Sequence, residues 1–169
     1  MAGWDAVSGL MDEVAGGWAA GTVTELPVEG AWYVAVPGGG DGPALVLAYD
    51  PEADRLLFRA GLGRPDPALR EATYAALLAY NGQALATGGG CVGIDRPGGE
   101  AVLRYEAPAD GLDADTLRGL LLDLLAAAEG WRAYVGREPS AAAGGEAPGQ
   151  APGQAPIDLD LLRYHAIRG

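Results

Sequence analysis

The longest regular pattern in the chain is DADTLRGLLLDLLAAAEGWRAY, residues 113–134. Its apolar positions recur at spacings of three and four, which is typical of a helix with one face packed on a core; they are Leu117, Leu120, Leu121, Leu124, Leu125 and Ala128. Asp113 stands directly before the pattern, where a carboxylate can accept hydrogen bonds from the first turn. The stretch therefore predicts the longest helix of the fold.

Upstream of this helix the pattern changes to short strands. Gly90–Asp95 and Glu100–Tyr105 flank a Pro-Gly-Gly turn sequence, so we expect a hairpin. Before the hairpin, Asp66 followed by Pro67 is a typical helix start, an N-cap carboxylate and then a proline at the first helical position. This second helix is expected to stop at Asn81, which a glycine follows.

The N-terminal part predicts a short helix and three strands. Trp4–Val14 places apolar residues at helical spacing. Ala31–Val36, Ala44–Tyr49 and Arg55–Ala60 are apolar and separated by turn sequences, which indicates an antiparallel meander. Residues 17–30 fit neither pattern and are left unassigned.

The resulting order is helix, three antiparallel strands, helix, two strands and helix. This order is typical of an α+β fold and not of an alternating α/β fold. We expect residues 1–135 to form this domain, 136–156 to be a Pro/Gly/Ala-rich linker, and 157–169 to be an apolar C-terminal tail segment. The tail is expected either to dock on a surface or to fray.

Composition excludes several classes of partner. The 169 residues carry a net charge of −12, and every basic residue is an arginine or the single histidine. Such a surface repels nucleic acids and anionic lipids, and no apolar run is long enough to span a bilayer. With one cysteine and no signal sequence, the chain is expected in a reducing compartment, most simply the bacterial cytoplasm.

The residues that enzymes use for nucleophilic catalysis are scarce. The single histidine is His165, and the two serines are Ser8 and Ser140, one in the first helix and one in the linker. A nucleophile needs a base beside it, and this distribution gives none. We therefore predict that the chain is not an enzyme, while catalysis by carboxylates alone remains a minor alternative.

Two apparent ligand motifs also fail, so no cofactor and no metal is expected. The glycines between residues 38 and 42 lack the lysine that a phosphate-binding loop requires. Asp50, Glu52 and Asp54 are spaced like a calcium loop, but its glycine and glutamate positions hold Arg55 and Gly61. The lone Cys91 is expected to be a small buried residue in a strand.

Several stretches together resemble the class I type III secretion chaperones of the Tir-chaperone type. The similarity lies in residues 69–131, chiefly in Leu77-Leu78-Ala79-Tyr80-Asn81, Gly89-Gly90-Cys91-Val92-Gly93-Ile94-Asp95, Ala101-Val102-Leu103-Arg104-Tyr105, Leu112-Asp113 and Ala128-Glu129-Gly130-Trp131. The element order, the size and the acidity agree with that family. The linker and the tail are not part of its usual pattern.

The resemblance implies a homodimer that holds the N-terminal segment of a secreted effector in extended form. An extended segment can place its side chains in apolar grooves and pair its backbone with a strand edge. Candidate groove residues are Leu10, Val14, Trp32, Val34, Leu45 and Leu47, with ordinary core packing as the alternative for each. The family pattern places the dimer interface around Leu77, Leu78 and Val92.

Two other classes of protein compete with this interpretation. A YbjN-like bacterial domain resembles the same α+β fold and has no established secretion client. A structural assembly component would form higher-order oligomers without a client.

Overall fold

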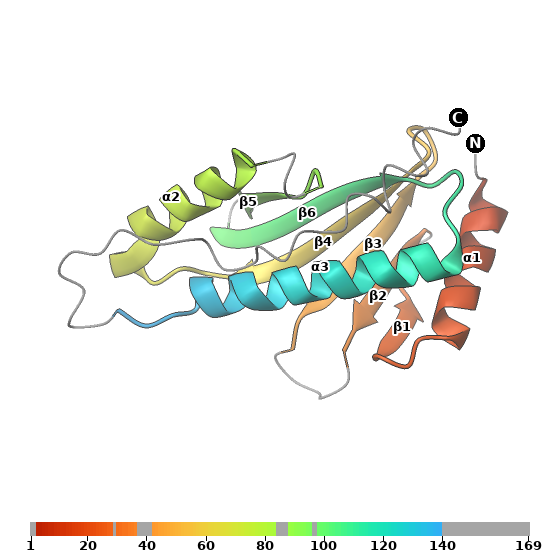
Figure 1. Ribbon diagram of the computed structural model, residues 1–169, viewed down its shortest axis with the longest axis horizontal. Helices are drawn as coiled ribbons and strands as arrows, with labels where there is room; N and C mark the ends of the chain where they lie inside the picture. Colours follow the sequence, from red (N-terminus) through yellow and green to blue (C-terminus); the bar gives the residue numbers. More distant parts are fainter. Residues whose placement is uncertain (1–2, 29, 37–41, 84–87, 96–97, 140–169) are drawn as a thin grey trace.

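The computed structural model describes residues 3–28, 30–36, 42–83, 88–95 and 98–139. Figure 1 shows its elements in chain order, which are α1 (Trp4–Gly16), β1 (Thr22–Glu25), β2 (Ala31–Ala35), β3 (Ala44–Asp50), β4 (Arg55–Gly63), a 3-10 turn (Pro67–Leu69), α2 (Arg70–Asn81), β5 (Cys91–Asp95), β6 (Glu100–Pro108) and α3 (Ala114–Val135). The predicted tail segment and most of the predicted linker lie outside the described residues.

The six strands form one antiparallel sheet in the order β1-β2-β3-β4-β6-β5. The predicted α+β class is confirmed, as is the predicted hairpin of β5 and β6. The predicted count of three strands before the second helix is wrong, because β1 pairs with β2 over Thr22–Glu25. This strand is short, lies at the sheet edge and is mostly exposed, so it has little of the apolar alternation that marks a half-buried strand.

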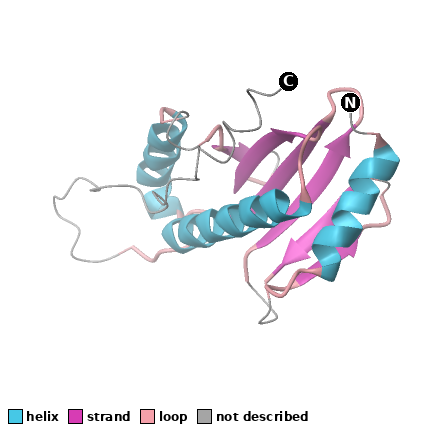
Figure 2. Cartoon of the chain, turned by 45° about the vertical axis from the view of Figure 1, so that its right-hand side comes forward, coloured by secondary structure: helices cyan, strands magenta, loops and turns pink. Residues whose placement is uncertain are grey.

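The helix α3 lies along one face of the sheet, and α1 lies beside it (Figure 2). The N-cap of α3 is the predicted one, since Asp113 Oδ1 accepts a hydrogen bond from the Thr116 N–H at 2.7 Å. All six residues of the predicted apolar stripe are buried. The two helices are tied by Arg118, which donates to the carbonyl oxygen of Glu13 at the end of α1 and to the Asp115 carboxylate.

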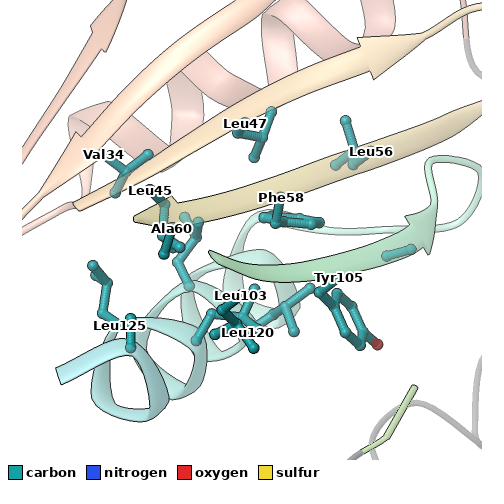
Figure 3. Packing of buried hydrophobic residues seen from close by; sticks show 14 of the residues in the cluster. Val34, Leu45, Leu47, Leu56, Phe58, Ala60, Leu103, Tyr105, Leu120 and Leu125 are labelled. Atoms are coloured by element: carbon teal, nitrogen blue, oxygen red, sulfur yellow. The ribbon is translucent and has the colours of Figure 1, made fainter. Parts of the chain in front are cut away.

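The core lies between α3 and the sheet (Figure 3). From the sheet it receives alternate side chains of the central strands, among them Leu45, Leu47, Leu56, Phe58 and Leu103. The intervening residues point to the opposite face, where Val46 and Leu57 are half-buried and Tyr33 is 39% exposed. Among the residues that the structure describes, helices therefore cover one face of the sheet only.

The helix α2 lies beside β5 at the end of the sheet (Figure 1). The preceding 3-10 turn is capped as predicted, because Asp66 Oδ1 accepts from the Ala68 N–H at 2.7 Å. On its inner face, Tyr80 packs edge-on against Trp131 of α3, with ring centroids 5.2 Å apart. This contact fixes the end of α2 relative to the C-terminal half of α3.

Candidate functional site

Five of the six predicted groove residues lie in the core. Val14, Trp32, Val34, Leu45 and Leu47 are all buried within the single chain, and Figure 3 shows three of them among the core residues near α3. The structure brings them together, but on the covered face of the sheet. A partner cannot reach these five side chains in this conformation, so the surface that it meets has to be made by their neighbours.

Leu10 is the predicted groove residue that is open to solvent. It is half-buried on α1 and packs against the outside of the core. Trp4 on the same helix is also half-buried, and its ring stacks on that of Trp32, with centroids 5.4 Å apart and an interplanar angle of 21°. Both side chains lie on α1, which packs beside β1 (Figure 2).

The strand β1 forms a free edge of the sheet in the described part of the chain. The Leu26 N–H, just beyond the strand, donates to the carbonyl oxygen of Ala31 at 2.8 Å. Backbone groups alternate in direction along an antiparallel strand. Thr22 and Thr24 therefore point their peptide groups at β2, whereas Val23 and Glu25 point theirs outward.

Apolar side chains surround this edge. Val23 pairs with Val34 and so faces the helix side of the sheet, where it is half-buried. At the turn after β1, Leu26 is half-buried and Val28 is 67% exposed. Together with Trp4 these residues form what we call the β1 edge site: Trp4, Val23, Leu26 and Val28. It combines unpaired backbone groups with accessible apolar surface.

The turn at Gly30 shapes this site. Its φ of +79° is a backbone conformation that favours glycine, and a Cβ there would lie 3.4 Å from the Trp4 ring. The Gly30 carbonyl oxygen also accepts from the Tyr49 N–H at 2.8 Å. Glycine at this position thus lets the chain turn from β1 into β2 directly under the tryptophan of α1.

The opposite edge strand, β5, is partly closed by a side chain of α2. The Asn81 Nδ2 donates to the carbonyl oxygen of Val92, and the Asn81 Oδ1 accepts from the Val92 N–H, both at 2.8 Å. The sequence showed Asn81 only as the end of a helix. Its second role could not be inferred, because the partner lies 11 residues further along the chain.

The three predicted dimer residues are placed differently from one another. Leu77 and Val92 are buried within the single chain, whereas Leu78 is 71% exposed on the outer face of α2. Ile94, on β5, is 37% exposed. Of the three, Leu78 is therefore the one that a second chain can contact directly.

One thiol and two buried tyrosine hydroxyls lie on or next to β5. Cys91 is exposed on β5, so the expectation that it is buried is wrong; Gly93, not Cys91, occupies the half-buried position beside Val92. Burial raises the pKa of Tyr80 and of Tyr105 above the usual tyrosine value. No group of three metal-binding side chains occurs in the ranges that the structure describes.

A model of the Tir chaperone protein (CesT) family matches residues 34–132, more than half of the chain. The chain therefore belongs to the Tir chaperone protein family. This membership confirms the resemblance inferred from the sequence, and a chaperone family agrees with the prediction that the chain is not an enzyme. No curated protein gives a significant match.

Two solved structures share the fold. A chain of the HopA1–SchA chaperone–effector complex is 21% identical with a TM-score of 0.58, and the match covers 75% of this chain and 92% of that one. A chain of the ExsC–ExsE complex is 22% identical with a TM-score of 0.60, covering 80% and 97%. Within the described part of this chain, no helix combines the length and the apolar character that a membrane crossing requires.

Proposed function

We propose that this protein is a type III secretion chaperone that binds the N-terminal segment of a secreted effector in extended form. Binding keeps the effector soluble and competent for secretion in the bacterial cytoplasm. The observation that carries the proposal is the β1 edge site, an unpaired strand edge beside accessible apolar side chains in a member of a chaperone family. Both similar structures come from complexes, one of them described as a chaperone–effector complex.

The effector segment adds a strand to the sheet in this proposal. Its backbone pairs with the outward peptide groups of Val23 and Glu25. Side chains opposite these two residues then point to the helix side of the sheet, because directly paired residues share a face. There they meet Trp4, which supplies apolar contact while the backbone supplies hydrogen bonds that do not depend on sequence.

The energy of this mode is modest and suits a client that has to be released. Burying one leucine-sized side chain contributes about 1.5–3 kcal/mol. Ordering an unfolded segment costs about 2–5 kcal/mol of the gross interaction energy. Two or three well-buried side chains are therefore needed, and the β1 edge site offers that many positions.

The charge of the protein favours a basic client. The helix α1 carries Asp5, Asp12 and Glu13 at exposed positions, and Glu25 is exposed on the edge strand β1. Opposite charges on a client steer its approach and raise the association rate. Association should therefore slow as ionic strength rises.

We also propose that two copies pair through the outer face of α2, centred on Leu78. Leu78 is 71% exposed, the largest exposed fraction among the large hydrophobic residues that the structure describes. Burial of Leu77 and Val92 in the single chain leaves them to support the interface from beneath. Light scattering should report about twice the 17.2 kDa chain mass, and a monomer would contradict the proposal.

Coexpression with the products of neighbouring genes tests the proposed function. A retained product should still bind after its folded domains have been removed, and NMR of the bound fragment should show extended structure without a fold of its own. Val28→Asp should weaken retention, and Leu122→Asp on the outer face of α3, also at an exposed position, is the matched control. Retention that depends on a folded domain of the product would refute the proposal.

A further inference from the structure

The side chain of Asn81 occupies the place of a neighbouring strand. A carboxamide presents one donor and one acceptor, as the peptide groups of a paired strand residue do. Asn81 uses both on the backbone of Val92. A segment that approached β5 would find these hydrogen-bonding positions already taken.

Alternation along β5 shows how much of this edge is closed. Because the N–H and C=O of Val92 point to α2, those of its neighbours Cys91 and Gly93 point to β6. The next outward residue within the strand is Ile94. Asn81 thus occupies one of the two outward positions between Cys91 and Asp95, whereas no strand of the described residues takes either outward position of β1.

The helix that carries Asn81 is held firmly. Tyr80, the preceding residue, is buried against Trp131. Leu77, one turn earlier, is also buried, and so is Thr73 a further turn back. Removing Asn81 from Val92 by moving α2 would expose this inner face, so an incoming segment cannot displace the side chain cheaply.

We propose that Asn81 determines at which edge this protein accepts an extended segment. It closes β5 and so confines strand addition to β1. The inference rests on the proposed function, since it concerns the same client segment. It assigns to Asn81 a positioning role and no contact with the client.

The closing test uses the full chain and the client fragment retained on coexpression. Cys91, the single cysteine, is exposed on β5 next to Val92. In one protein this cysteine is labelled with a fluorescent donor. A second protein carries the donor on β1 through Thr24→Cys and Cys91→Ser. The client fragment carries the acceptor. The two edges are only five strand spacings of about 4.8 Å apart, so the donor and acceptor are a pair that transfers over short distances. Transfer should then be strong from residue 24 and weak from residue 91, with one fragment bound per chain.

Asn81→Ala should open the second edge. We expect transfer from Cys91 to appear, the stoichiometry to rise to two fragments per chain, and the Val92 amide to exchange about tenfold faster or more. Asn81→Asp keeps the acceptor for the Val92 N–H but loses the donor, and should give an intermediate result without the full loss of contact. Glu71→Ala, exposed on the same helix, is the matched control.

Each result decides between the two proposals. Faster exchange at Val92 with binding still confined to β1 would show that Asn81 does not select the edge, although the chain is a chaperone. Strong transfer from Cys91 in the unmodified protein would also overturn the inference. A chain that binds no fragment at either edge would overturn the proposed function and, with it, this inference.

Discussion

The two edges of the sheet differ in how their backbone groups are used. At β1 the peptide groups of Val23 and Glu25 face outward with no strand of the described residues beside them, and half-buried apolar side chains lie close by. At β5 the side-chain amide of Asn81 hydrogen-bonds to both the N–H and the C=O of Val92, and α2 lies beside the strand. Free strand edges invite pairing with other chains, so proteins cover the ones that they do not use. The difference agrees with the proposal that β1 is the edge for a partner, and it shows that β5 is protected.

The largest expected effect concerns the core that supports both edges. Leu47→Ala should lower the free energy of unfolding by about 2–5 kcal/mol, because it removes a fully buried side chain from the central sheet. Val23→Ala, at the half-buried position on β1, should cost less stability and weaken client binding instead. Urea denaturation and calorimetric titration separate the two effects. Weakened binding at unchanged stability in Leu47→Ala would restore the prediction that Leu47 lines a groove.

The next prediction concerns the α2 side of the molecule. Leu78→Glu should shift the protein from the proposed dimer toward the 17.2 kDa monomer at micromolar concentration, because burial of a charge without a partner is unfavourable. Leu122→Glu places the same change on the outer face of α3 and should leave the mass unchanged. Multi-angle light scattering distinguishes them. A dimer that survives Leu78→Glu would move the interface elsewhere.

A smaller effect is expected at the open edge. Val23→Pro removes an N–H that points away from the sheet, and should weaken client binding about fivefold to tenfold, the value of one net hydrogen bond. Thr24→Pro removes an N–H that points to β2, and should lower stability instead. Binding isotherms of both variants with the retained fragment check the direction of each peptide group. Equal affinity of Val23→Pro and the unmodified chain would show that β1 does not pair with the client.

The smallest effect concerns pH at the closed edge. Burial, and secondarily the charge of Cys91, raises the pKa of Tyr80 in the folded chain. The unfolded chain then loses this proton first as the pH rises above about 10, so stability falls with further increase in pH. Tyr80→Phe should reduce that loss in denaturation curves measured between neutral and alkaline pH. An unchanged pH dependence would show that the Tyr80 hydroxyl is not shielded from water on the inner face of α2.

Much of the fold followed from periodicity in the sequence. The leucine stripe of α3, the caps Asp66 and Asp113, and the hairpin of β5 and β6 were all predicted, because each depends on residues close together in the chain. The strand β1 was missed. Its four residues are mostly exposed, and such an edge strand has little burial to leave a pattern.

The site was harder to predict than the fold. The sequence correctly placed Trp32 and Val34 in one strand, but it could not show that the protein's own core covers their side chains. The hydrogen bonds of Asn81 depend on where α2 ends relative to β5, which is a property of the tertiary structure. Similarly, the exposure of Cys91 depends on which face of β5 the register leaves open.

The arginine that ties α3 to α1 has a consequence for synthesis of the protein. Glu13 and Arg118 are 105 residues apart in the sequence, yet their hydrogen bond joins α3 to α1, the helix that lies beside β1. The ribosome therefore synthesises β1 long before α3, the helix whose Arg118 contacts α1. Until α3 has emerged, the face that it covers stays exposed to water. The proposed binding of a client therefore depends on synthesis of α3, and a chain that stops before α3 is expected to hold no client.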